Sequence, residues 1–265
     1  MIDIHCHLLP QIDDGSKSPE SSLDQLKLMA EGGITDAFLT AHYMPGTYHY
    51  DRPAYDAKLR KLRDLADQNQ VRINLHPGFE IYLHPFSGND IEKHNLRLGD
   101  TRYILVESDM NGLPTDFYEN LYPLLRKGYK PVLAHAERYV SIMNNVHDAK
   151  DLIRRDVYMQ INAGSLLGQY GEKVRQTAWL LLRNGWAHFL ASDDHAKAPY
   201  GAYFKAVDLI RTELDADVAE LLTQDFPAKL LNNESVPYKY VYHQANHNHY
   251  HHSKKKKTVW QRIFG

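Results

Sequence analysis

Two histidines separated by one residue stand near the start of the chain, in the sequence His5-Cys6-His7. The apolar residues before them predict a strand over Met1–Ile4, and side chains two positions apart on a strand point the same way. His5 and His7 can therefore bind one metal ion together, while Cys6 faces the opposite side as a small buried residue. A pair of this kind is also compatible with two ordinary polar residues at the end of a strand.

Further histidines and carboxylates follow other apolar segments of the chain. They are Asp13-Asp14 in the next loop, His42, Glu80, Glu107, the run His135-Ala136-Glu137-Arg138 and the run Ser192-Asp193-Asp194-His195. Taken singly, each is a surface polar group or a helix cap. Taken together, they lie at the carboxyl ends of predicted strands, which form the rim that holds the active site in parallel α/β barrels. Unpaired charges that converge there would repel, so a bound cation is the simplest explanation.

The types of donor restrict the metal. Imidazoles and carboxylates without a thiolate suit manganese, iron or zinc, whereas magnesium accepts few imidazoles. The number of donors exceeds what one ion can use, so the sequence predicts two or three clustered ions. Clusters of this kind are typical of phosphoester hydrolysis, because they activate water and stabilise charge on the phosphoryl group.

Seven apolar runs predict the strands that position these residues. They are Met1–Ile4, Ala37–Thr40, Val71–Leu75, Tyr103–Glu107, Pro131–Ala134, Val157–Ile161 and Ala187–Ala191. Helical periodicity lies between them, as in a helix that begins at Ser18-Pro19 and ends at Gly32-Gly33. Two last helices are predicted over Tyr200–Leu214 and Asp217–Leu231. Strands that alternate with helices predict a parallel sheet, and seven strands in one domain favour a barrel.

The composition divides the chain into two parts. The 265 residues are 43% hydrophobic, which is enough for a large core, and we assign residues 1–231 to one barrel domain. The composition becomes polar near Asn232, and residues 232–265 are rich in histidine and lysine, so we predict a flexible tail outside the barrel. A net charge of −2 and a pI of about 6.8 give no indication of nucleic-acid binding.

Three features of the sequence predict where in the cell the protein is located. A single cysteine, a start without a signal peptide and the lack of a long apolar run favour the cytoplasm. Lys254–Lys257, followed by Trp260, Ile263 and Phe264, could make weak contact with an anionic membrane surface. A plain solvated end is the alternative for this basic tail and for its histidines.

The motifs as a set resemble the PHP (polymerase and histidinol phosphatase) superfamily. The resemblance is carried by Met1–Pro10, Asp13-Asp14-Gly15, Gly78–Ile81, His135–Tyr139 and Ser192–His195, and it extends from Met1 to about Leu231. Within the superfamily, the chain is most similar to manganese-dependent protein-tyrosine phosphatases of Gram-positive capsule and exopolysaccharide operons. The resemblance implies a distorted (β/α)7 TIM-like barrel and a tyrosine-phosphorylated substrate, specifically a bacterial tyrosine autokinase that controls polysaccharide assembly.

The resemblance also implies a role for each site residue. The first of three ions would bind His5, His7, Glu80 and Asp193; the second Glu80 as a bridge, Glu107 and His135; and the third Asp14, His42 and His195. Arg138 would bind phosphate, since a guanidinium fork matches the charge of the phosphoryl oxygens. A surface ion pair between Arg138 and Glu137 is the alternative.

The chain departs from the family pattern at two places. Ala136 stands where relatives usually have proline, which should only loosen the loop. Relatives often carry an arginine shortly after the last Asp-x-His motif, and in this chain Lys197 or Tyr200 could replace it. Lysine would offer a point charge instead of a fork.

Three other functions compete with the tyrosine phosphatase. A phosphatase for histidinol phosphate or another small phosphomonoester would share the barrel and the metals. A non-catalytic scaffold that binds phosphotyrosine would keep the ligands without hydrolysis. A cysteine-based phosphatase is a poor rival, because that chemistry needs an arginine six residues after the nucleophile, and Ile12 occupies that position after Cys6.

Overall fold

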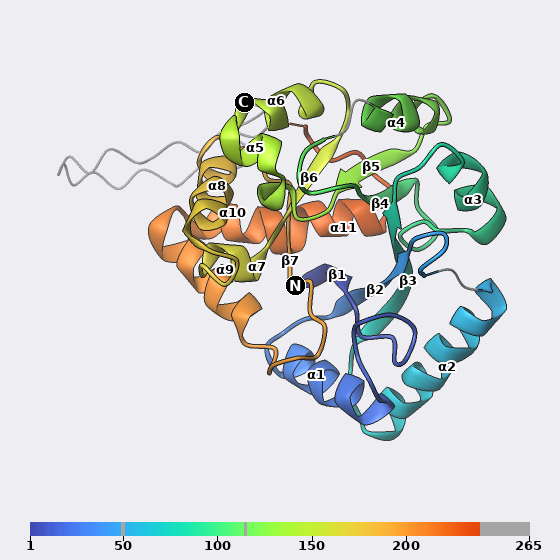
Figure 1. Ribbon diagram of the computed structural model, residues 1–265. Helices are drawn as coiled ribbons and strands as arrows, with labels where there is room; N and C mark the ends of the chain where they lie inside the picture. The colour runs from blue at the N-terminus through green and yellow to red at the C-terminus, as the bar shows by residue number, and fades with distance from the viewer. Residues whose placement is uncertain (49–50, 114–115, 239–265) are drawn as a thin grey trace.

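Seven parallel strands form a barrel that is surrounded by helices (Figure 1). The computed structural model describes residues 1–48, 51–113 and 116–238. The strands are β1 (Ile2–Cys6), β2 (Asp36–Tyr43), β3 (Asn74–Tyr82), β4 (Tyr103–Glu107), β5 (Lys130–Leu133), β6 (Tyr158–Asn162) and β7 (Phe189–Ala191). They pair in chain order, and a bridge between Cys6 and Asp194 connects the end of β7 to β1. The predicted α/β barrel is confirmed.

Helices lie between successive strands and cover the outside of the barrel, and the last four follow β7. They are α1 (Pro19–Glu31), α2 (Arg52–Gln68), α3 (Ser87–His94), α4 (Asp116–Arg126), η1 (Ala136–Arg138), α5 (Val140–Asn144), α6 (His147–Ile153), α7 (Ala163–Leu166), α8 (Glu172–Arg183), α9 (Ala202–Glu213), α10 (Ala216–Glu220), η2 (Leu221–Asp225) and α11 (Phe226–Leu231). The Ser18 hydroxyl accepts from the backbone N–H of Ser21 and caps α1 where the sequence predicted its start. Among the described residues, no helix combines the length and the apolar character that crossing a membrane requires.

Strand β3 differs from its prediction, which placed it at Val71–Leu75. It runs from Asn74 to Tyr82, through Pro77 and Gly78 and beyond the predicted end at Leu75. Two features let the strand continue. Proline costs the sheet one N–H donor, but Pro77 still has a carbonyl acceptor, and the backbone N–H of Gly78 donates to the Tyr55 hydroxyl at 3.1 Å. Glu80 is therefore a residue of the strand and not of the following loop.

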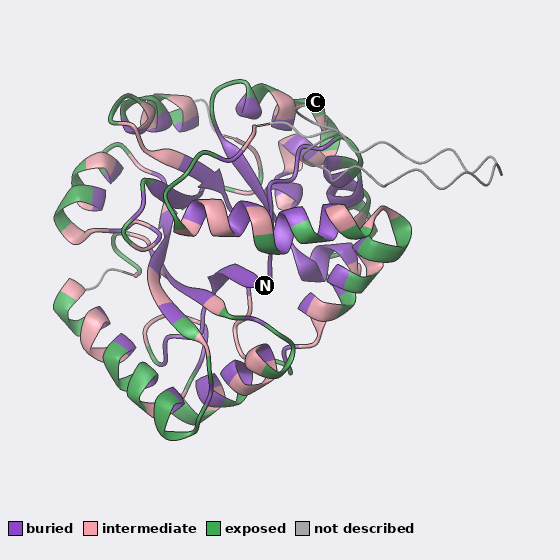
Figure 2. Ribbon diagram, turned by 180° about the vertical axis from the view of Figure 1, so that it is seen from behind, coloured by how far each residue is buried: buried purple, intermediate pink, exposed green. Residues whose placement is uncertain are grey.

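The chain after α11 packs along the amino ends of the strands. Tyr103, Tyr158 and His188, which stand at or just before the starts of three strands, hydrogen bond to the backbone oxygens of Glu234, Val236 and Tyr238. The α10–α11 segment crosses the barrel beside the N-terminus, and most of the residues that face the strands are buried (Figure 2).

The predicted tail, residues 232–265, therefore begins later than Asn232. Val236 is 2% exposed and the ring of Tyr238 stacks on Tyr158 with centroids 4.5 Å apart, so burial of apolar surface holds residues 234–238 on the barrel. The histidines of the tail, Lys254–Lys257 and the aromatic residues after them lie outside the described residues, so the domain division and the membrane contact remain predictions.

Candidate metal centre

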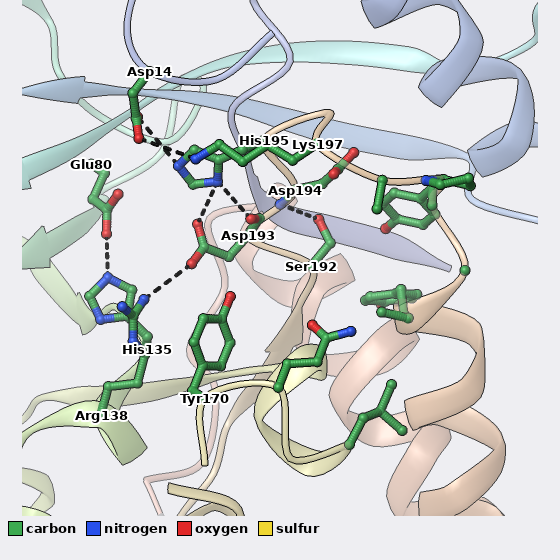
Figure 3. Close-up of a pocket in the computed structure, with 18 of the residues that line it drawn as sticks. Asp14, Glu80, His135, Arg138, Tyr170, Ser192, Asp193, Asp194, His195 and Lys197 are labelled. Atoms are coloured by element: carbon green, nitrogen blue, oxygen red, sulfur yellow. Dashed lines mark hydrogen bonds and ion pairs between the residues drawn. The ribbon is translucent and has the colours of Figure 1, made fainter.

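The nine predicted metal ligands meet at the carboxyl rim of the barrel, with Arg138 beside them. Figure 3 labels five of the ligands together with Arg138: Asp14, Glu80, His135, Asp193 and His195. Most of them line a cavity of about 750 Å³ that opens between the ends of the strands and the segment from Lys197 to Lys205. The pairing register contributes directly, because His42 of β2 lies beside Glu80 of β3. Side chains from distant parts of the chain thus come together, as the positions at the strand ends predicted.

The first group of ligands comes from β1, β3 and the end of β7. The Nε2 atoms of His5 and His7 are 3.0 Å apart, which confirms that the two imidazoles point the same way. Each Nε2 lies 3.2–3.3 Å from Glu80 Oε2 and 3.4 Å from Asp193 Oδ1. Cys6 faces the opposite side and is fully buried, with its Sγ 3.3 Å from the backbone oxygen of Phe38.

Glu80 connects the first group to the second. Its Oε1 lies 2.8 Å from His135 Nε2, while Glu107 Oε2 lies 3.9 Å from the same nitrogen. The structure adds His42 to this neighbourhood, since its Nδ1 is 3.2 Å from Glu80 and 3.1 Å from Glu107. The two oxygens of the Glu80 carboxylate therefore face different groups of ligands, as a carboxylate that bridges two metal ions must.

Asp14 connects the third group of side chains. Its Oδ1 lies 3.5 Å from His42 Nε2 and 3.4 Å from His195 Nε2. Lys197 Nζ lies 3.6 Å from the other oxygen of Asp14. His42 thus uses one ring nitrogen toward Asp14 and the other toward Glu107, so it stands between two of the groups.

The charges of the rim depend on one another. Burial alone would lower the pKa of His5, but the carboxylates of Glu80 and Asp193 outweigh burial and raise it to about 9. Burial likewise works against the charged carboxylates, yet the neighbouring histidines hold the pKa values of Glu80 and Asp193 well below their usual range. The pKa of His195, in contrast to that of His5, is lowered, because burial and the nearby His7 disfavour its charged form. The imidazoles and carboxylates of the first group thus stabilise each other's charged forms, whereas His195 is stabilised in its neutral form.

The donor set fits a metal cluster. Two Nε2 atoms that face each other at 3.0 Å need either a shared proton or a cation between them. Asp14 Oδ1 and His135 Nδ1 are buried and have no hydrogen-bond partner within the described part of the chain, so each can accept a metal ion or a further polar group. Three subsets each bring ligand atoms within 4.8 Å of one another: His7, Asp14, His42 and His195; His5, His7 and Asp193; and His42, Glu80 and Glu107.

Two ligands have a left-handed backbone that directs them into the site. His135 has φ 37° at the end of β5, and Asp193 has φ 52° shortly after β7. Such conformations are costly for residues with a Cβ and are concentrated at functional sites. Backbone hydrogen bonds maintain the conformation at Asp193. The N–H of Asp193 donates to His5 O at 2.9 Å, and the N–H of His7 donates to Asp194 O at 2.8 Å.

A second layer of polar side chains orients the ligands; the sequence placed Asp13 at the rim without a separate role and gave none to Gln160 or Asn162. Asp13 accepts from His7 Nδ1 at 2.9 Å, Gln160 Oε1 lies 3.0 Å from His5 Nδ1, and Asn162 donates to Asp193 at 2.7 Å. Such partners fix the ring orientation of ligating histidines and raise their basicity. A signal was present, because Gln160 and Asn162 alternate on one face of a strand that is otherwise apolar, and both are fully buried.

Arg138 lies next to the first group at the end of η1. Its Nη1 is 3.6 Å from Asp193 Oδ2, and its side chain is 25% exposed. The alternative of a surface pair with Glu137 is wrong, because Glu137 is fully buried and accepts hydrogen bonds from Asn162 N and Ser165 Oγ.

Lys197 and Tyr200, the two residues that could replace the arginine of relatives, differ in their surroundings. The Tyr200 hydroxyl is buried and donates to Asp3 Oδ2 at 2.7 Å, so it is directed away from the opening. Lys197 is 69% exposed and its ammonium lies at the rim. Of the two, only Lys197 can present its polar group to a ligand in the cavity.

The barrel and its rim of histidines and carboxylates define a PHP-type fold. The family described as Capsular polysaccharide synthesis, CpsB/CapC, matches residues 1–232, and the chain belongs to this family. The resemblance drawn from the motifs is thereby confirmed.

Known proteins agree with this assignment. Tyrosine-protein phosphatase YwqE of Bacillus subtilis is 30% identical over 238 residues, which are 89% of this chain and 93% of that protein. A solved structure from the work on YwqE of B. subtilis and CpsB of Streptococcus pneumoniae, which are described as metal-dependent tyrosine phosphatases, superposes with a TM-score of 0.82. The two chains are 29% identical, and the match covers 89% of this chain and 96% of that one.

A more distant structure shares the fold alone. Histidinol phosphate phosphatase of Lactococcus lactis superposes with a TM-score of 0.55 at 16% identity, over 80% of this chain and 92% of that chain. The barrel is therefore common to phosphatases for different substrates, and the choice between them depends on the site and on the family.

Proposed function

We propose that this chain is a metal-dependent protein-tyrosine phosphatase. The observation that carries the proposal is the cluster at the rim, where histidines and carboxylates from six strands face one another around Glu80 and Arg138 stands at its edge. Membership of a family whose relatives are named tyrosine-protein phosphatases supports the choice of substrate.

We assign the ligands to three ions. His5, His7, Glu80 and Asp193 would hold the first, Glu80, Glu107 and His135 the second, and Asp14, His42 and His195 the third. The close approach of His42 to Glu107 makes it a candidate to share with the second ion. Manganese is the ion we propose, with iron or zinc as alternatives that the same donors accept.

The chain's own residues bind and orient the phosphoryl group. Bound metal ions would supply Lewis acidity and an activated water at neutral pH. Arg138 would donate from its guanidinium edge to the phosphoryl oxygens and stabilise the charge that they carry in the transition state. Lys197 would add a point charge at the rim, in the place of the arginine that relatives often have.

The substrate that we propose is a tyrosine-phosphorylated protein. A cavity that opens at the rim and is partly apolar, with Met110, Leu167 and Tyr170 in its wall, suits an aryl phosphate presented on a protein chain. The association of the family with capsular polysaccharide synthesis supports a bacterial tyrosine kinase of polysaccharide assembly as the partner, which would place the reaction in the cytoplasm.

Phosphate release from matched substrates tests the proposal. The purified chain is stripped with chelator and given phosphotyrosine, phosphoserine and histidinol-phosphate substrates, with and without added Mn²⁺. We expect hydrolysis that needs the metal and favours phosphotyrosine. Preference for histidinol phosphate would overturn the substrate, and a chain that binds metal and phosphotyrosine without hydrolysis would be a scaffold.

A further inference from the structure

The guanidinium of Arg138 rests on an aromatic ring. Its Cζ lies 4.6 Å from the centroid of the Tyr170 ring, and the two side chains stand together at the wall of the cavity (Figure 3). An aromatic face attracts a guanidinium without occupying its in-plane N–H donors. The ring therefore restrains the cation and leaves those donors available to a ligand.

The other contact of this guanidinium is a weaker restraint. Arg138 Nη1 is 3.6 Å from Asp193 Oδ2, which is longer than a hydrogen bond. The same oxygen already accepts from Asn162 at 2.7 Å, and the second oxygen of Asp193 faces His5 and His7. Asp193 is thus shared among several partners, whereas the Tyr170 ring lies outside the groups of metal ligands.

A tight turn fixes the position of Tyr170. Gly168 and Gly171 have φ values of +81° and +96°, which favour glycine. The backbone N–H of Gln169 donates to the oxygen of Gly164 at 3.0 Å, and a Cβ at Gly164 would lie 3.2 Å from Cε2 of Tyr170. Glycine at position 164 lets the turn and the ring lie close against α7.

We propose that Tyr170 is a positioning residue that holds the Arg138 guanidinium in place for the phosphoryl group. The inference rests on the proposed function and deepens it. Tyr170 is 41% exposed, so its ring can be changed without opening the core. In this role the aromatic ring of Tyr170 acts and its hydroxyl does not, and the ring has an effect only when Arg138 is present.

Variants at both positions test this role. Tyr170→Leu removes the ring, Tyr170→Phe keeps it, and Tyr122→Leu, at a 62% exposed tyrosine of α4, serves as the matched control. Two quantities are measured on the manganese-loaded protein: the affinity for inorganic phosphate by calorimetry, and kcat/KM for a phosphotyrosine peptide. We expect Tyr170→Leu to lower both by roughly tenfold, Tyr170→Phe to restore them to within about threefold, and Tyr122→Leu to match the wild type.

A double-mutant cycle separates positioning from direct contact with the substrate. In an Arg138→Ala background, Tyr170→Leu should cause no further loss, because the ring then has no cation to hold. An undiminished loss in that background would overturn the proposal, as would a Tyr170→Leu protein that equals the wild type. If the wild type binds phosphate but hydrolyses no substrate, the proposed function fails, while the phosphate affinities still decide the role of Tyr170.

Discussion

The two ends of the barrel bury histidines in opposite electrostatic settings. At the carboxyl rim, His5 is surrounded by Glu80 and Asp193, and these carboxylates overcome burial and raise its pKa to about 9. At the amino end, His188 receives the backbone N–H of Met159 on Nδ1 and lies 2.6 Å from Tyr238 O through Nε2, so that burial lowers its pKa to about 4. Both side chains are fully buried.

This difference shows that burial alone does not mark a functional histidine. His188 is neutral and satisfied by backbone groups, and it ties β6 and β7 to the last described residues of the chain. His5 shares its surroundings with other imidazoles and with negative charge that only protons or metal ions can balance. The rim gathers donor groups of the kind that cations bind, whereas the histidine at the amino end holds the last described residues on the barrel.

Loss of the bridging carboxylate should have the largest effect on the rim. Glu80→Gln removes the charge that faces His5, His7, His42 and His135, so we expect the phosphatase activity to fall by at least about a hundredfold and the bound metal to decrease. Metal content by elemental analysis and phosphotyrosine hydrolysis measure this. Glu137→Gln is the matched control, since Glu137 is equally buried but hydrogen bonds away from the ligands, and it should retain the metal.

The pH dependence of stability should have opposite signs at the two ends. A His188 pKa of about 4 in the folded state, against about 6.5 unfolded, means that the unfolded chain takes up a proton first as the pH falls. Stability from this group is fully present above pH 6.5 and is lost between 6.5 and 4, by roughly 3 kcal/mol at about 1.4 kcal/mol per pKa unit. His188→Gln should flatten the acid side of a plot of free energy of unfolding against pH.

The metal-free rim should lose stability on the alkaline side. The folded pKa of His5, about 9, lies above its unfolded value, so its contribution is present below pH 6.5 and is lost as the pH rises through 9. Bound metal replaces these protons, and the manganese-loaded protein should not show the alkaline loss. Equal pH profiles for the two forms would contradict a cluster in which protons and metal ions compete.

Loss of a residue that orients a metal ligand should weaken metal binding less than loss of the ligand itself. Asp13 accepts from His7 Nδ1 and from the backbone N–H of His42, so Asp13→Asn should weaken manganese binding by about tenfold to a hundredfold. The amino end offers a matched pair, since Asp36 lies 2.8 Å from His76 Nε2. Asp36→Asn should leave the manganese affinity unchanged, and a manganese titration of both variants measures the difference.

An exposed charge at the rim should have the smallest effect. Lys197 is 69% exposed and 3.6 Å from Asp14, so solvent screens it. We expect Lys197→Ala to raise KM for a phosphotyrosine peptide by about twofold to fivefold at low salt, and by less at high salt. A large fall in kcat would instead place Lys197 among the groups that act in the transition state.

The strand-end ligands could be predicted from the sequence because the signal is local. A short apolar run that ends in a histidine or a carboxylate needs no knowledge of distant contacts, and β4, Tyr103–Glu107, was found at its predicted bounds. The same local reasoning ended β3 too early, because Pro77-Gly78 is usual in turns and the Tyr55 hydroxyl that supports Gly78 comes from another element.

The remaining features depend on tertiary contacts. Asn162 is 31 positions from Asp193, and Tyr170 is 32 positions from Arg138, so no spacing in the sequence pairs them. The packing of residues 234–238 on the barrel was missed for the same reason, since the partners of that segment, Tyr103, Tyr158 and His188, lie 50 to 131 positions away.

Anomalous diffraction from crystals grown with Mn²⁺ tests the central claim most directly, because it locates each ion among the side chains of the rim. We predict two or three peaks at the manganese edge, bounded by His5, His7, Glu80, Asp193 and the other assigned ligands, and none at His188. Peaks missing from the rim of a protein that hydrolyses phosphotyrosine would contradict the metal cluster and would require a different catalytic group.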